Sequence, residues 1–279
     1  MNLISKEKII DLTPQNPYDR FPDGRPKVPD GILERMREVT IEEAWSVLNQ
    51  NGYQYQFEGN WLNLHPDRIL VGRAVTGRFV PTRPDLHEVI EAEGKANGRI
   101  GGQNSWVIDT LVKDDVIVIE LFGKVVKGTF TGDNLSTAVN ARTGGTGMVV
   151  DGGMRDYQRV MELPKFNGFI KGLHPTGIRD VTLTEINGPA RIGEATVLPG
   201  DVVLGTPAGV IFIPPHLAEA VVDRSEVVRL RDFWGKLMIK QGKYTPGEID
   251  RKWPEEIDAD FAEWARTHGL NDIDPQQLV

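Results

Sequence analysis

Two adjacent side chains, those of Arg155 and Asp156, offer the clearest chemistry in this sequence. The planar guanidinium group of an arginine pairs with a carboxylate, and an aspartate oxygen is a hard ligand for a divalent cation. An arginine beside an aspartate at the end of a strand can therefore hold a 2-oxo acid against a metal ion. The same two residues could also form an ordinary ion pair in a surface turn. The residues alone leave both interpretations open.

The segment 132–156 has to position this pair. The pattern predicts a strand over 125–130, a Gly132-Asp-Asn134 turn, a helix over 134–142 and, after the turn 144–147, a strand over 148–150. Glycines let backbone N–H groups approach a small anion, and the start of a helix presents N–H groups without partners. This segment therefore suits the binding of a small anion.

Composition excludes several other kinds of chemistry. The chain has 279 residues, 39% of them hydrophobic, and no cysteine, which rules out disulfides, thiolate nucleophiles and cysteine-ligated metals. Its 32 Lys plus Arg against 40 Asp plus Glu give a net charge of −8, which disfavours nucleic acid as a partner. The apolar runs are too short to span a membrane, and the first residues do not resemble a signal peptide. We therefore expect a cytoplasmic protein that binds neither nucleic acid nor a membrane.

The order of the predicted elements suggests a core with an extension at each end. Prolines are so frequent in the first thirty residues that we predict an irregular N-terminal arm over 1–34. Thr40 and Glu43 form a capping box that begins a helix ending at Asn51-Gly52. Many strands follow with few helices between them, which favours a mixed sheet sandwich flanked by helices. A long helix over 216–241 and a Trp-rich helical tail complete the chain, so we place a core at 35–230 and a C-terminal helical extension at 231–279.

Several motifs in this core resemble those of one family, that of the regulator of ribonuclease E activity A and 4-hydroxy-4-methyl-2-oxoglutarate aldolase, often mislabelled dimethylmenaquinone methyltransferase. The matching motifs are Val71-Gly-Arg-Ala-Val-Thr76, Gly132-Asp-Asn134, Gly147-Met-Val-Val-Asp-Gly-Gly-Met-Arg-Asp156, Leu198-Pro-Gly-Asp201 and Gly209-Val-Ile-Phe-Ile-Pro214. The resemblance implies an α/β fold, a three-layer β/β/α swivelling-domain sandwich. It also implies a homotrimer or homohexamer with active sites at subunit interfaces.

In the aldolase branch of this family, the resemblance gives each motif residue a role. Arg155 matches the arginine that grips the substrate carboxylate, and Asp156 matches the aspartate that binds Mg²⁺ or Mn²⁺. The family motif has an acid, twenty residues and then Arg-Asp, which puts Asn134 in the place of the acid and Asp133 one residue away. Either Asp133 serves after a one-residue insertion in 143–146, or Asn134 replaces the acid. The substrate would also contact backbone N–H groups near Leu135 and Ser136 and the amide of Asn104.

The resemblance favours a metal-dependent lyase, an aldolase or decarboxylase, that cleaves a small 2-oxo acid or a sugar-derived oxo acid through a metal-stabilised enolate. Two alternatives stay open. The first is a protein-binding regulator of a ribonuclease, a branch in which the metal-binding aspartate is typically lost, whereas Asp156 is present here. The second is a metal-dependent sugar-acid isomerase or dehydratase that uses the same site.

Overall fold

The computed structural model describes residues 4–268. Its helices are α1 (Lys6–Leu12), α2 (Asp30–Met36), α3 (Ile41–Gln50), α4 (Pro84–Ala96), α5 (Gln103–Ile108), α6 (Asp133–Thr143), α7 (Tyr157–Val160), the 3-10 turn η1 (Pro215–Leu217), α8 (Ala218–Lys240), α9 (Pro246–Ile249) and α10 (Glu255–Thr267). Its strands are β1 (Phe57–Glu58), β2 (Leu62–Asn63), β3 (Leu70–Pro81), β4 (Asp115–Thr131), β5 (Gly147–Met154), β6 (Asn167–Leu173), β7 (Val181–Ile186), β8 (Ala190–Ile192), β9 (Ala195–Val197), β10 (Val202–Thr206) and β11 (Gly209–Ile213).

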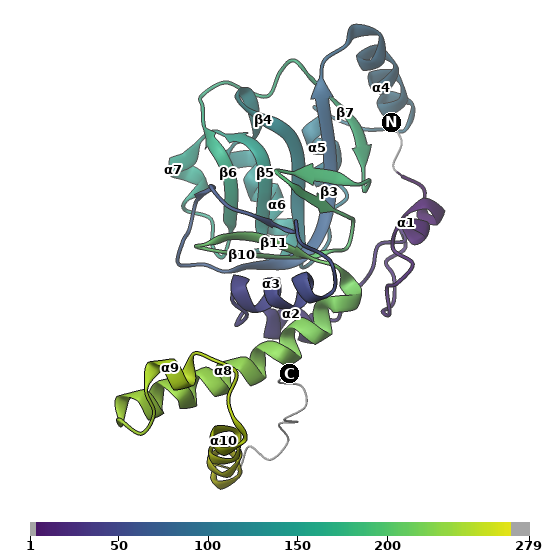
Figure 1. Ribbon diagram of the computed structural model, residues 1–279. Helices are drawn as coiled ribbons and strands as arrows, with labels where there is room; N and C mark the ends of the chain where they lie inside the picture. The colour runs from purple at the N-terminus through teal and green to yellow at the C-terminus, as the bar shows by residue number, and fades with distance from the viewer. Residues whose placement is uncertain (1–3, 269–279) are drawn as a thin grey trace.

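One mixed sheet organises the core, with the strand order β1-β11-β10-β3-β4-β5-β6-β2 and with β7 paired to β3 (Figure 1). Strands β3 to β6 are parallel, and their continuous apolar runs, such as Val116–Ile119, are typical of parallel strands buried on both faces. The long strand β3 pairs with β10 through 70–73 and with β4 through 73–78, so it joins the two parts of the sheet.

Three apolar clusters hold these layers together. One lies between the parallel strands and helices α4 to α7, and a second lies between the strands and the β8–β9 hairpin. The third packs helices α2, α3 and α8 against β10 and β11. A large mixed sheet with a second β layer and covering helices confirms the predicted three-layer β/β/α fold.

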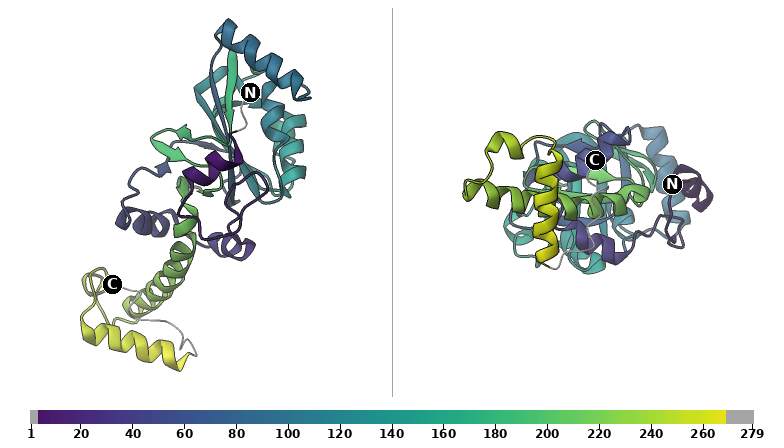
Figure 2. Two further views of the ribbon diagram at one scale, coloured as in Figure 1. Left: turned by 90° about the vertical axis from the view of Figure 1, so that its right-hand side faces the viewer. Right: turned by 60° about the horizontal axis from the view of Figure 1, so that its bottom comes forward.

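The two extensions differ from each other. The arm expected to be irregular contains α1, which Ser5 caps through the N–H of Lys8, and α2 crosses its predicted end at residue 34. Helix α8 likewise crosses the predicted boundary at 231, and with α9 and α10 it projects away from the core (Figure 2). Trp234, Trp253 and Phe261 pack against one another there, as expected for the Trp-rich tail. The last part of the predicted extension, 269–279, lies outside the described residues.

Among residues 4–268, no helix is both long enough and apolar enough to cross a bilayer.

Candidate active site

Arg155 and Asp156 lie where β5 ends and α7 begins. The Arg155 N–H group donates a hydrogen bond to the carbonyl oxygen of Thr131, at 3.0 Å, which ties this corner to the end of β4. Asp156 has a left-handed backbone, with φ of +57°, a conformation that costs an L-residue roughly 1 kcal/mol or more. The two side chains are 45% and 31% exposed, so both can reach a ligand.

Gly132 leaves the space in which these side chains meet. A Cβ atom at this position would overlap Asp156 Oδ2 and would lie 3.1 Å from Arg155 Nε. The backbone of Gly132, with φ of −119° and ψ of −161°, is one that any residue can adopt. The absence of a side chain at Gly132 is therefore what admits the Asp156 carboxylate.

Asp133 is the second carboxylate at this corner. Its N–H group points at Asp156 Oδ2, 3.4 Å away, and Arg155 Nη1 lies 3.5 Å from the same oxygen. Asn134 is exposed, and its N–H group donates to Asp133 Oδ1 at 2.9 Å. Asp133, rather than Asn134, is thus the residue that contacts Asp156.

Arg159 adds a positive charge to this corner. Its Nη1 atom lies 4.0 Å from Asp133 Oδ2, and its side chain is largely exposed. Arg159 therefore places a positive charge beside the Asp133 carboxylate.

Three other residues that were predicted to contact the substrate make contacts within the protein. The Asn104 side chain is buried, and its Nδ2 donates to the Phe130 carbonyl oxygen at 2.7 Å. Ser136 is also buried: its hydroxyl donates to Thr131 Oγ1 at 3.0 Å, and its N–H group bonds to the Gly132 carbonyl oxygen at 3.0 Å. Leu135 packs partly against the core, in the first turn of α6, where N–H groups lack partners inside the helix. Contact of these residues with substrate stays a prediction.

The donor set suits a magnesium-type cation only in part. Among residues 4–268, no cluster of three or more His, Asp or Glu side chains could hold a metal. Mg²⁺, however, usually keeps several water ligands and needs only one or two carboxylates together with the substrate. Asp156 supplies one such carboxylate, and Asp133, whose N–H group lies 3.4 Å from Asp156 Oδ2, carries a second at the same corner, so these residues fit a hydrated cation.

Comparison with known proteins agrees with this architecture. A family model described as RraA-like, Aldolase/RraA, matches residues 39–212, which is more than half of the chain. Protein DlpA of Legionella pneumophila is 30% identical over 215 residues, covering 76% of this chain and 32% of DlpA. The uncharacterized protein MJ0644 of Methanocaldococcus jannaschii is 28% identical over 134 residues, covering 46% of this chain and 64% of that protein. The match therefore covers less than two thirds of each of these two relatives.

A solved structure shares the fold. RraAS2 of Streptomyces coelicolor, described as an unusual member of the RNase ES inhibitor RraA protein family, superposes with a TM-score of 0.64. The match has 23% sequence identity and covers 79% of this chain and 99% of RraAS2. RraAS2 therefore has a counterpart for nearly all of its length here, while about a fifth of this chain has none.

Proposed function

The chain belongs to the aldolase/RraA family, and from that premise we propose that it is a divalent-metal-dependent carbon–carbon lyase, an aldolase or decarboxylase. Its substrate would be a small 2-oxo acid or a sugar-derived oxo acid. One observation carries the proposal: Arg155, Asp156 and the N–H group of Asp133 converge where Gly132 leaves room for them. A cation beside an arginine is the arrangement that the carboxylate and carbonyl of a 2-oxo acid require.

The metal ion would be Mg²⁺ or Mn²⁺, held by Asp156 with support from Asp133. When bound, such an ion supplies Lewis acidity that draws charge from the substrate carbonyl.

The protein's own residues would position the substrate. Arg155 is free to take the substrate carboxylate because its nearest acid, Asp156, is 3.5 Å away, longer than a tight ion pair. A guanidinium fork fixes both the position and the orientation of a carboxylate. The Leu135 N–H group, in the first turn of α6, would be a second donor to the same anion. Asp133 would orient a water molecule and move a proton at the reacting carbon.

We further propose a homotrimer or homohexamer in which a neighbouring subunit covers this site. Arg155 and Asp156 are 45% and 31% exposed in the single chain, which leaves the reacting groups open to bulk water. Catalytic electrostatics are stronger where water is excluded. A neighbouring subunit would supply that cover and the remaining wall of the pocket.

The test is the release of pyruvate or CO₂ from 4-hydroxy-4-methyl-2-oxoglutarate and from oxaloacetate, with Mg²⁺ and with EDTA. We expect activity that EDTA abolishes and that Asp156→Ala reduces at least a hundredfold. The matched control is Asp109→Asn. Asp109 forms another arginine–aspartate pair on the surface, in which its Oδ1 atom lies 2.8 Å from Arg142 Nη2. Activity that is indifferent to EDTA, or equal in Asp156→Ala and wild type, would contradict the proposal.

The projecting C-terminal helices favour one alternative, a protein-binding regulator of a ribonuclease. Helices α8 to α10 extend beyond the core (Figure 2), and the similar structure RraAS2 is described as belonging to a family of RNase ES inhibitors. Capture of ribonuclease E by the full chain, without turnover of any oxo acid, would favour this function. A panel of sugar acids in the same assay tests the remaining alternative, an isomerase or dehydratase that uses the same corner.

A further inference from the structure

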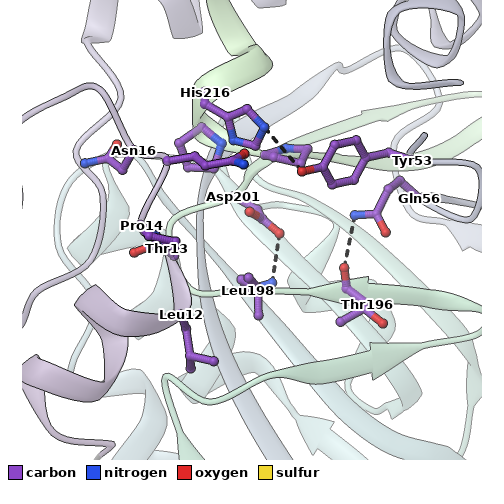
Figure 3. A pocket seen from close by; sticks show the side chains of 13 residues that line it. Leu12, Thr13, Pro14, Asn16, Tyr53, Gln56, Thr196, Leu198, Asp201 and His216 are labelled. Atoms are coloured by element: carbon purple, nitrogen blue, oxygen red, sulfur yellow. Dashed lines mark hydrogen bonds between the residues drawn. The ribbon is translucent and has the colours of Figure 1, made fainter. Parts of the chain in front are cut away.

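A cavity of about 430 Å³ (Figure 3) has a lining that includes neither Arg155 nor Asp156. Four parts of the chain enclose it: the end of α1 with the segment that follows it (12–16), the segment between α3 and β1, the segment from β9 to β10, and the residues between β11 and α8. Its lining residues are Leu12, Thr13, Pro14, Gln15, Asn16, Tyr53, Gln56, Thr196, Leu198, Asp201, Pro214, Pro215 and His216. The proposed lyase activity uses none of them.

Hydrogen bonds within the protein hold this lining in place. Arg20 donates to the hydroxyl and the carbonyl oxygen of Thr13, each at 2.7 Å, and so fixes the segment that follows α1. Gln56 Nε2 donates to the carbonyl oxygens of Thr196 at 3.0 Å and Phe212 at 3.2 Å. Hydrogen bonds within the protein therefore fix the shape of the cavity, and most of its polar groups already have a partner.

Asp201 is the exception among these polar groups. Its side chain is only 3% exposed, and the one hydrogen bond it makes to the described residues is from the Leu198 N–H group to Oδ2, at 2.8 Å. Burial raises the pKa of Asp201 to about 8, so the carboxyl group is mainly protonated near neutral pH. The carboxyl group of Asp201 lines the cavity, so its O–H group is then a hydrogen-bond donor available to a ligand there.

The rest of the lining disfavours a charged ligand. No lysine, arginine or glutamate lines the cavity, and its remaining titratable groups are Tyr53 and His216, which lie 3.3 Å apart (Tyr53 Oη to His216 Nε2). Burial lowers the pKa of His216, which favours the neutral form of its ring. An anion would find no cation here, and Leu12, Leu198 and the prolines give the walls an apolar character.

We propose that this cavity binds a small uncharged molecule with an apolar body and one hydroxyl or carbonyl oxygen, which accepts a hydrogen bond from the Asp201 carboxyl group. The apolar walls would bury the body of the ligand, and its oxygen would lie against the Asp201 carboxyl group. This site is separate from the oxo-acid site, so it stands whether or not the chain is a lyase.

Three probes of nearly equal shape test the proposal: benzyl alcohol, benzylamine and benzoate. Titrations of the full chain followed by NMR should give saturable shifts for benzyl alcohol at pH 6.5, around Leu198 and Gln56, with at least tenfold weaker binding of the two charged probes. Thr196→Trp, at an exposed position on the rim, should abolish these shifts. Preferred binding of benzylamine or benzoate, or unchanged binding in Thr196→Trp, would overturn the proposal.

The pH dependence gives a second, independent readout. Benzyl alcohol should bind wild type at least fivefold more weakly at pH 9 than at pH 6.5, because Asp201 loses its proton. Asp201→Asn keeps both an acceptor for Leu198 and a donor for the ligand, so its affinity should be the same at the two pH values. Tyr53→Phe should retain the wild-type pH dependence. If Asp201→Asn fails to fold, the wild-type pH series decides alone, and pH-independent binding would refute the role of Asp201.

Discussion

Replacing Gly132 with alanine isolates the geometry on which the proposed activity depends. The added methyl group would overlap Asp156 Oδ2 and come within 3.1 Å of Arg155 Nε and 3.2 Å of Arg155 Cγ. Gly132 has an extended backbone that alanine adopts without strain. The substitution therefore acts on the two functional side chains and not on the path of the chain.

The size of the effect follows from this overlap. To restore a normal carbon–oxygen contact, the Asp156 carboxylate has to move by roughly 1 Å. A displacement of that size at a reacting centre costs about a hundredfold in rate, which corresponds to about 2.7 kcal/mol. Alanine in place of glycine at the residue that caps α6 costs at most about 1 kcal/mol of the free energy of unfolding. We therefore expect a loss of activity that far exceeds the loss of stability.

The assay is kcat/KM for pyruvate release, measured as a function of Mg²⁺ concentration together with the melting temperature. Gly132→Ala should lower kcat/KM about a hundredfold, while the melting temperature changes by only a few degrees. Gly177→Ala is the matched control because a Cβ atom there would meet no atom within 4 Å. A Gly132→Ala protein with kcat/KM within threefold of wild type would refute the idea that this corner positions the substrate.

Three further predictions concern the site and the fold. Asp133→Asn should lower kcat/KM at least tenfold, because it removes the carboxylate proposed to move the proton, and Asn134→Ala should lower it less than threefold; the reverse order would assign the acid position to Asn134. Folding raises the pKa of Asp201 to about 8. The protonated carboxyl group therefore stabilises the folded protein fully below about pH 4, and this stabilisation is lost as the pH rises to about 8, with a slope of at most about 1.4 kcal/mol per pH unit. Urea titrations at several pH values should show this slope in wild type and not in Asp201→Asn. Arg25→Ala should lower the free energy of unfolding by about 3–5 kcal/mol, because it leaves the fully buried Asp115 carboxylate without the guanidinium group 2.9 Å away; a loss below 1 kcal/mol in urea unfolding would contradict this.

The elements with strong local signals could be predicted from the sequence. The Thr40 capping box forms as expected, with Glu43 N–H donating to Thr40 Oγ1 at 3.2 Å and Thr40 N–H donating to Glu43 Oε2 at 2.8 Å. The predicted strand at 125–130 is part of a longer strand, β4, which begins at Asp115. Positive φ angles at Phe122 and Gly123 bend this strand without ending it. Beyond the bend, β4 pairs with β5 again. The local sequence does not show this pairing.

Long-range contacts explain what the sequence could not reveal about the candidate active site, the cavity and the arm. Helix α1 was missed because the prolines that follow it dominate the pattern, whereas its position depends on contacts such as that between Ile4 N–H and the Ile186 carbonyl oxygen, at 3.2 Å. The sequence places Asn104 and Asp201 in suggestive motifs, but it does not show which of their polar atoms the fold already uses. The Asn104 amide donates to the Phe130 carbonyl oxygen, whereas the Asp201 carboxyl group lines a cavity.

The residue types at positions 132 and 156 indicate that the corner between β4 and α7 serves to place a carboxylate, and does not serve only to turn the chain. Asp156 has the left-handed backbone that glycine adopts at no cost, yet an aspartate stands there. Gly132 has an extended backbone at the start of α6, where serine, asparagine or aspartate would cap the helix better, yet a glycine stands there. Neither residue is the best choice for its own backbone. Both choices become reasonable if the requirement is an Asp156 carboxylate lying directly against residue 132, within reach of Arg155 and the Asp133 N–H group.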